Sequence, residues 1–398
     1  METQKLRAWW FARQGLDGRC GESDSASILN KTGWARSVGG SNPYITLFAR
    51  GGIDRASAEN AAEHNEISEL PAVRGCTYML PARDYALGLA AGESFRAAEM
   101  RVAMKLGVTE AEIETLCEAI VDALGSTSLS PDEIRIACGD ASRSLGEEGK
   151  KKGITTTVPL ALGKLQAMGA IKRVPIGGRL DQQRYKYKNW VPNPRSGFSL
   201  TTEEVSTEIA RRFFRWAGPA TLPEFQWFSG LGVGASKLAV APLDLVTIPE
   251  DPNRLIHKDD LLAWEAFQAP SEPTYALVSS IDGISLLRRD LKSIIDPVDA
   301  ERPMIASKVM SNLGGLADLP SNAILDRGRL VGLWEYDTTS DSIVWNSFIL
   351  RNAEMVAAVS TMETFITNEL GDARSFSLDS PKSREPLVHF LREAALHE

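Results

Sequence analysis

The chain has 398 residues, of which 43% are hydrophobic and 24% charged, and its formal net charge is −8. These values are typical of a globular protein with about two or three domains. No apolar run reaches the roughly 18 residues of a membrane span, and the N-terminus lacks a signal-peptide pattern, so we expect a cytoplasmic protein without membrane contact.

Cysteines and histidines give no support to metal or triad chemistry. The four cysteines (Cys20, Cys76, Cys117 and Cys138) lie far apart, without the paired spacing of zinc ligands. The four histidines are scattered too. We therefore expect reduced thiols, no metal and no cofactor.

Residues 1–105 predict a helix-rich, winged-helix-like unit. Helices are expected over 6–14 and 25–36, and the glycine-rich stretch 39–43 ends the second. Residues 74–80 indicate a short strand closed by Pro81, and a helix returns at Asp84.

Residues 106–192 predict a winged-helix domain. Thr109 with Glu112 and Ser130 with Glu133 are capping boxes, and Pro131 suits a first helical turn. A loop over 143–153 precedes a helix that starts at Thr155-Thr156-Thr157. Strands are expected over 171–175 and 180–188, around a glycine turn. Helix, helix and hairpin is the order of a winged helix, whose second helix enters a DNA groove.

The charge of this stretch favours a DNA-binding face. Residues 141–190 hold 11 Lys and Arg against 3 acidic residues, a net of +8, so the rest of the chain carries −16. Phosphate binding depends on local cation density, so an acidic chain can still bind DNA. A solvated, charged edge strand is the alternative interpretation. We expect phosphate contacts from Lys150, Lys151, Lys152, Arg173, Arg179, Arg184 and Lys186.

Two further sets of residues can contact DNA. The amides at Thr155, Thr156 and Thr157 can bind a phosphate at a helix N-terminus, although a simple cap explains them equally well. Gln182 and Gln183 can reach a base edge or a lesion.

The remaining residues predict two more units. Residues 198–270 hold capping boxes at Thr201 with Glu204 and at Thr221 with Glu224, a third winged-helix-like pattern with few cations. A packing module that binds no DNA fits it at least as well. Residues 271–398 predict an antiparallel sheet or small barrel with strands near 275–280, 284–288, 324–336 and 342–350, a helix over 354–370 and a solvated tail over 375–384.

Five stretches carry a family resemblance, and they read, in order, ARQGL at 12–16, NPY at 42–44 with LFAR at 47–50, RGCTYMLPARD at 74–84, GPAT at 218–221 with WFSGL at 227–231, and ILDRGRLVGLW at 324–334. Together they resemble the bacterial winged-helix DNA glycosylases that remove bulky alkylated bases and unhook interstrand crosslinks. The resemblance implies an α+β fold with tandem winged-helix domains and a C-terminal antiparallel β domain. It also implies double-stranded DNA as the partner and, in our expectation, a monomer.

The chain departs from this family at the catalytic positions. The family's Gln-x-Gln or Gln-x-Asp element, which positions the attacking water, falls on Arg36-Ser37-Val38. The histidine of its His-x-x-Pro element falls on Tyr78. Valine cannot bond a water, and a guanidinium donates only, so it cannot take a proton.

If excision persists, other side chains must orient or deprotonate water. The nearby candidates are Tyr44, Tyr78, Asp84 and Arg36, with Asn42 beside them. Asp84 is the one carboxylate in this set, although a helix cap is the simpler interpretation of its position.

Three hypotheses follow from these observations. The first is a repair glycosylase with altered chemistry, which flips its target base or reaches a distorted lesion. The second is a DNA-binding protein without catalysis, either a regulator or a lesion-recognition factor. The third is a protein whose winged helices only pack, and the basic stretch argues against it.

Replacing Arg179 or Arg184 by alanine should weaken binding to duplex DNA of any sequence. Because each side chain is expected to neutralise one phosphate, the slope of log affinity against log salt should fall by about one unit. Titrations at several salt concentrations measure this slope. An unchanged slope in both variants would refute the placement, and a wild type that does not bind at low salt would leave only the third hypothesis.

Overall fold

Four helices begin at the capping residues that the sequence predicts. The computed structural model describes residues 2–182, 184–306 and 309–396. All four predicted capping boxes form, at Thr109, Ser130, Thr201 and Thr221. Each satisfies two amides that the first helical turn would otherwise leave without partners.

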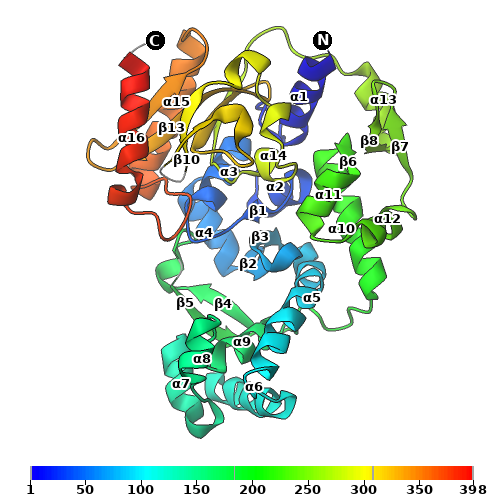
Figure 1. Ribbon diagram of the computed structural model, residues 1–398, viewed down its shortest axis with the longest axis vertical. Coiled ribbons are helices and arrows are strands. Elements are labelled where there is room, and N and C mark those ends of the chain that lie inside the picture. The colour runs from blue at the N-terminus through cyan, green and yellow to red at the C-terminus, as the bar shows by residue number, and fades with distance from the viewer. Residues whose placement is uncertain (1, 183, 307–308, 397–398) are drawn as a thin grey trace.

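The N-terminal unit packs helices around a small antiparallel sheet (Figure 1). The strands lie in the order β1-β3-β2, so β3 is central. The elements are α1 (Glu2–Arg13), α2 (Ser25–Thr32), β1 (Ala35–Arg36), α3 (Asn42–Gly51), α4 (Arg55–Glu63), β2 (Ile67–Pro71), β3 (Thr77–Pro81) and α5 (Tyr85–Met104).

The basic unit lies below the rest of the molecule in Figure 1 and has its own hydrophobic core. Its last two strands form an antiparallel ribbon, and Leu129 bridges to Tyr187 beside it. The elements are α6 (Glu110–Leu124), α7 (Pro131–Cys138), α8 (Gly146–Lys151), α9 (Val158–Ala167), β4 (Ile171–Pro175) and β5 (Tyr185–Asn189). We call β4, β5 and the turn between them the ribbon.

The third unit combines a helical group with a three-stranded sheet in the order β6-β8-β7. Its core joins that of the N-terminal sheet and α5, so these parts pack as one body. The elements are α10 (Thr202–Ala217), β6 (Ala220–Thr221), α11 (Leu222–Ser229), α12 (Val233–Val240), β7 (Leu245–Ile248), β8 (Asp251–His257) and α13 (Lys258–Ala266).

The C-terminal unit is built on an antiparallel sheet in the order β14-β13-β12-β9. A separate hairpin is formed by β10 and β11. The elements are β9 (Tyr275–Val278), α14 (Gly283–Leu286), β10 (Pro303–Ala306), β11 (Val309–Asn312), β12 (Asn322–Asp326), β13 (Arg329–Asp337), β14 (Ser342–Ser347), α15 (Ala353–Phe365), a π-helical turn (Ile366–Leu370) and α16 (Pro381–Leu396). The predicted mixture of helices and antiparallel sheets is confirmed.

Several local predictions differ from the structure, wholly or in part. The expected strand over 284–288 is helix α14, which the Asp282 carboxylate caps. The expected loop over 143–153 contains α8, whose lysines pair with glutamates three residues earlier. The strand expected from residue 180 begins at Tyr185 because Leu180 is buried in a neighbouring core. The tail expected to be solvated over 375–384 is mostly exposed, but α16 begins at Pro381 and Arg384 is buried against Asp372.

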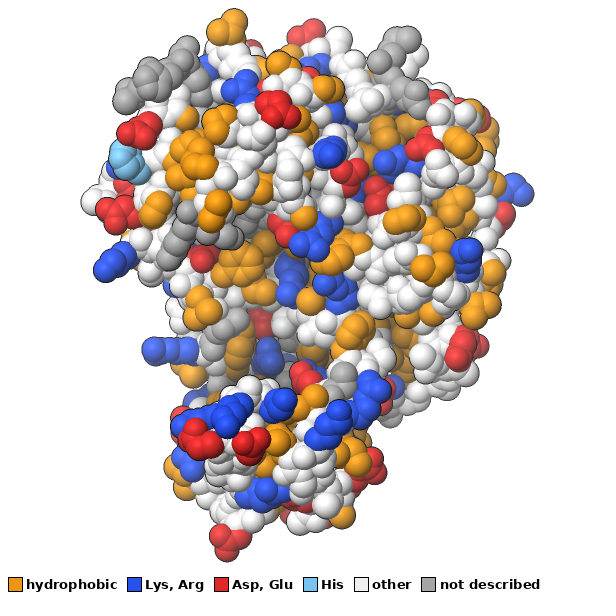
Figure 2. Space-filling view, viewed as in Figure 1, with side chains coloured by type: hydrophobic (Ala, Val, Ile, Leu, Met, Phe, Trp, Pro, Cys, Tyr) orange, Lys and Arg blue, Asp and Glu red, His pale blue; other side chains and the backbone are white. Residues whose placement is uncertain are grey.

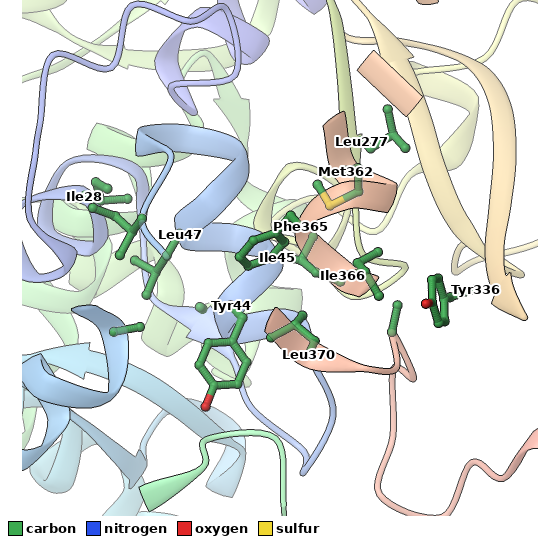
Figure 3. Packing of buried hydrophobic residues seen from close by; sticks show 14 of the residues in the cluster. Ile28, Tyr44, Ile45, Leu47, Leu277, Tyr336, Met362, Phe365, Ile366 and Leu370 are labelled. Carbon is green, nitrogen blue, oxygen red and sulfur yellow. The ribbon is translucent and has the colours of Figure 1, made fainter. Parts of the chain in front are cut away.

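One hydrophobic core joins the two ends of the chain (Figure 3). Helix α3 supplies Ile45 and Leu47, and α15 with its π-turn supplies Phe365 and Ile366. Phe48 stacks on Phe365 with ring centroids 3.9 Å apart. The C-terminal unit therefore packs on the N-terminal one, although more than 300 residues separate these segments in the sequence.

A buried ion pair fixes the same junction. The Arg50 guanidinium donates to both carboxylate oxygens of Asp282, each at 2.8 Å. The two side chains are 1% and 0% exposed. Asp282 also accepts the amide of Ile284, so one carboxylate anchors α3 and starts α14.

The Asp282→Ala substitution should destabilise the protein by about 3–5 kcal/mol, because it leaves the Arg50 charge buried and unpaired. Urea unfolding measures the free energy. Asp132→Ala, which removes the partner of Arg135 in an exposed pair on α7, is the matched control and should leave stability nearly unchanged. Equal losses in the two variants would contradict the role assigned to burial.

Candidate functional site

A cavity of about 660 Å³ lies between the N-terminal unit and the ribbon. Figure 2 shows the molecule hollowed between the lower unit and the body above it, with Lys and Arg side chains gathered around the hollow. The cavity, which we call the ribbon cleft, is lined by α4, β2 and both ribbon strands. Its charged and hydroxyl-bearing lining residues are Glu59, Glu63, Ser68, Glu69, Lys172, Arg173, Tyr185 and Lys188.

Glu69 is the buried carboxylate of this cleft, and it is 9% exposed. One carboxylate oxygen accepts the Ser37 hydroxyl at 2.8 Å, and the other accepts the Arg173 guanidinium at 3.5 Å. The Tyr185 hydroxyl is a further partner. Glu69 therefore links segment 36–38, where the resemblance places the water-positioning element, to the ribbon.

Burial raises the pKa of Glu69 above its ordinary range. The Arg173 charge and the Ser37 hydroxyl act in the opposite direction but do not cancel the loss of water. A carboxyl group with a raised pKa can accept or return a proton nearer neutral pH, which is the property of a general acid or base.

Lys172 lies in the same cleft and is 6% exposed. Its ammonium donates to the Asn65 side-chain oxygen and lies 5.6 Å from the ring centroid of Trp190. Burial, together with the charge of the cross-strand neighbour Lys188, lowers the pKa of Lys172 to about 8. The cleft thus holds a carboxyl and an amine whose pKa values are shifted toward neutrality from opposite sides.

Tyr44, a predicted catalytic residue, lies at the edge of the ribbon cleft. Its hydroxyl donates to Glu59 and accepts the Leu180 amide, both at 2.8 Å. Figure 3 shows that the Tyr44 hydroxyl points away from the other side chains of the hydrophobic cluster. Burial raises the pKa of Tyr44, so the hydroxyl keeps its proton. Through its two hydrogen bonds this hydroxyl connects the ribbon turn to α4.

Arg36 and Tyr78, two more predicted catalytic residues, face the opposite side of the β1-β3-β2 sheet from Glu69. Arg36 pairs with Tyr78 and Ala35 with Met79 in the strand register, and Glu69 pairs with Met79. The Arg36 guanidinium lies 5.3 Å from the Tyr78 ring centroid. Burial raises the pKa of Tyr78 to about 12.

Asp84, the fourth predicted catalytic residue, is 0% exposed. It accepts the Trp34 indole at 2.8 Å and the Arg212 guanidinium at 2.7 and 3.0 Å. It stands at the N-cap position of α5 without making a capping bond. In this arrangement Asp84 fastens α10 to the N-terminal sheet.

The predicted DNA contacts divide into an exposed and an internal group. Lys150, Lys151, Lys152, Thr155 and Arg184 are exposed, and Lys150 and Lys151 pair only with exposed neighbours on α8.

The other group consists of side chains that already have protein partners. Arg173 reaches Glu69, and Arg179 pairs with Asp181 and donates to the Leu370 carbonyl. Thr157 is buried and its hydroxyl accepts the Arg143 amide. Lys186 lies 3.8 Å from Glu133.

Three predicted contacts complete the set. Thr156 bridges to Ser144, and Gln182 is half-buried. Gln183 lies outside the described residues.

Sequence reasoning missed Glu69, Ser37 and Lys172 as site residues. Glu69 stands in the sequence between ordinary strand residues, and neither its burial nor its contact with Ser37, 32 positions away, has a local signal. Lys172 could have been found from the sequence, because it is a lysine inside a predicted strand that also contains Ile171 and Val174.

The C-terminal segment covers the backbone beside the predicted water-positioning element. The Arg374 carbonyl accepts both the amide and the hydroxyl of Ser41. The Ser377 amide donates to the Val38 carbonyl at 3.1 Å. A side chain at Gly40 would collide with the Ser375 carbonyl.

Metal-ligand clusters and membrane-spanning helices are both absent from the described residues. No group of three or more His, Cys, Asp or Glu side chains there could hold a metal ion. Within the same ranges, no helix has the length and apolar character needed to cross a bilayer.

Comparison with known proteins places the chain in a family. The family model for DNA glycosylase AlkZ-like proteins matches residues 35–347. The solved structure of the DNA glycosylase AlkZ of Streptomyces sahachiroi superposes with a TM-score of 0.66 at 17% sequence identity. That match covers 93% of this chain and 97% of the other, and it shows that the two share a fold. No curated protein sequence matches the chain.

The protein is therefore of the DNA glycosylase class. Because the family model spans more than half of its length, the chain belongs to the AlkZ-like DNA glycosylase family.

The Glu69→Gln substitution should make the protein relatively more stable as the pH rises. A raised folded-state pKa means that ionised Glu69 costs stability, and this cost grows from about pH 4.5 upward, whereas glutamine cannot ionise. Each unit of pKa elevation corresponds to about 1.4 kcal/mol.

Urea unfolding from about pH 4 to about pH 8 measures this difference. Glu63→Gln, which removes an exposed carboxylate from the rim of the same cleft, controls for net charge. A gap between Glu69→Gln and wild type that stays constant with pH would show that Glu69 is not held as described.

Proposed function

We propose that this protein binds duplex DNA and excises bulky alkylated or crosslinked bases by hydrolysis of the N-glycosidic bond, with Glu69 serving the attacking water. Family membership supports the reaction class. The observation that carries the assignment to Glu69 is its contact with Ser37, inside the segment that matches the family's water-positioning element.

The chemistry requires a group that Arg36 and Val38 do not supply. Excision needs a side chain that orients or deprotonates water and stabilises a sugar that becomes cationic. A carboxylate accepts hydrogen bonds from water and carries the charge that stabilises such a sugar. Glu69 lines a cavity of about 660 Å³, within the size range of small-molecule sites, so the cleft can admit a flipped nucleotide.

The four residues expected from the sequence take supporting roles in this proposal. Tyr44 holds the ribbon turn beside the cleft through Glu59 and Leu180. Arg36 and Tyr78 lie one strand position away from Ser37 and Met79 and fix the sheet from its other face. Asp84 holds α10 through Arg212.

We assign DNA binding to the exposed cations and helix start of the basic unit and to the ribbon. In this proposal residues 1–105, 106–192 and 198–270 are winged-helix units, and residues 271–398 are a β domain. The protein acts as a monomer in the cytoplasm without metal or cofactor. The cations that remain exposed for phosphate are Lys150, Lys151, Lys152 and Arg184.

A second function rests on a specific observation. The water-positioning element of the family is replaced by Arg36-Ser37-Val38, and the C-terminal segment covers its backbone. Both features suit a DNA-binding protein that recognises lesions without cutting the glycosidic bond.

Incubation with alkylated or crosslinked duplexes tests the proposal, with released bases and abasic sites as products. Wild type should release base, and Glu69→Gln should lower the rate by about 10²-fold or more, because proton transfer by a positioned side chain contributes about that much. Affinity for the same duplex should hardly change. Glu63→Gln should retain both the rate and the affinity.

Each outcome separates the hypotheses. Binding without product across several adducts would support the non-catalytic function. Product formation that is equal in wild type and Glu69→Gln would keep the glycosylase and remove Glu69 from its mechanism.

A further inference from the structure

The Lys172 amine is unusual among the cations of this protein. Of the lysines that the structure describes, Lys172 is the one that is buried. Among the residues that the structure describes, no carboxylate pairs with it, and its ammonium donates to the neutral side chain of Asn65. A lysine that merely bound phosphate would gain nothing from such burial.

The surroundings of Lys172 favour the neutral amine. Removal from water penalises the charged form, and Lys188, its partner across the ribbon, adds a like charge. With a pKa of about 8, roughly one amine in ten is neutral at pH 7, against roughly one in three thousand for an ordinary lysine. A neutral amine can donate a hydrogen bond to Asn65 and still present its lone pair to an electrophile.

Desolvation and a neighbouring cation both lower the pKa of a lysine, and this activates the amine for Schiff-base formation. An electrophile suited to this cleft is an aldehyde on an anionic ligand, because the ribbon supplies Arg173 and Lys188 beside the amine. An abasic site in DNA is such a ligand, since its opened deoxyribose carries an aldehyde between two phosphates.

We propose that Lys172 forms a Schiff base with the sugar of an abasic site and that the ribbon cleft then breaks the DNA strand by β-elimination. This activity rests on the DNA binding of the proposed function, but not on base excision. The abasic site is also the product that the proposed excision would leave in the same cleft.

The reaction needs no oxidant or reductant. The Lys172 nitrogen adds to the C1′ aldehyde carbon, and the resulting carbinolamine loses water to give a protonated imine. A base removes the C2′ proton, and the C3′–oxygen bond breaks with its electron pair leaving on the phosphate. Water then hydrolyses the imine, which restores the amine and leaves an unsaturated aldehyde on the DNA end.

We assign the removal of the C2′ proton to Glu69, which is the buried one of the three carboxylates that line this cleft. It lines the same cavity as Lys172 and lies on β2, which packs beside β4. Its bond to Arg173, the residue after Lys172, keeps the carboxylate at this end of the ribbon.

Borohydride trapping tests the proposal on a duplex that already carries one abasic site, produced by uracil excision. Sodium borohydride reduces the imine and fixes the protein to the DNA, and peptide mapping identifies the modified residue. Wild type should give an adduct at Lys172 and, without borohydride, a nicked strand. Lys172→Met and Lys172→Arg should lower both yields at least tenfold.

The controls separate nucleophile from scaffold. Lys258→Met removes an exposed lysine of the third unit, paired with Asp244, and should match wild type. Affinity of the Lys172 variants for a duplex with a tetrahydrofuran abasic analogue, which has no aldehyde, should stay within about threefold of wild type if they fold and bind.

The results that would reject the Lys172 proposal differ from those that would reject base excision. No adduct with wild type, an adduct mapped elsewhere, or full trapping by Lys172→Met would each reject the inference. Absence of base release from alkylated DNA, with trapping at Lys172 intact, would reject excision and leave the lyase activity standing.

Discussion

The exclusion of water where the ribbon meets the N-terminal sheet is the constraint on which the proposed site depends. Glu69, Arg173 and Lys172 are all buried or half-buried at this joint and find partners across it. Separating the two surfaces would return each group to water but would break its hydrogen bonds. Arg173 meets the Glu69 carboxylate and Lys172 donates to Asn65, so these contacts fix how the basic unit sits on the body.

The same loss of water creates reactivity. A carboxylate and an ammonium both become less stable as ions when buried, so the pKa of Glu69 rises and that of Lys172 falls. The two groups line one cavity without pairing with each other, because Arg173 takes Glu69 and Asn65 takes Lys172. An acid–base group and a nucleophile can therefore coexist instead of neutralising one another.

Much of the architecture could be predicted from the sequence because its signals are local. Capping boxes such as Ser130 with Glu133 span one helical turn, and strand β4 has the length and apolar residues that were expected. The strand expected at 284–288 failed because Asp282, held by a distant arginine, starts a helix there.

Burial was the property that local patterns could not give. Arg173 and Arg179 look like free cations in the sequence, but each meets a carboxylate in the fold. Asp84 looks like a cap, but its oxygens are taken by Trp34 and Arg212 from distant segments. Glu69 becomes distinctive only when Ser37 is brought beside it, a contact that depends on β3 lying between β1 and β2.

The close approach of Gly40 and the Ser375 backbone constrains how the two segments can change in evolution. The loop that contains Gly40 can carry no side chain at this position, because the carbonyl of Ser375 occupies the space. Divergence of either segment is therefore conditional on the other. Relatives in which the segment around Ser375 is rebuilt should show a larger residue at the position of Gly40, and the pair can be followed as a single inherited character.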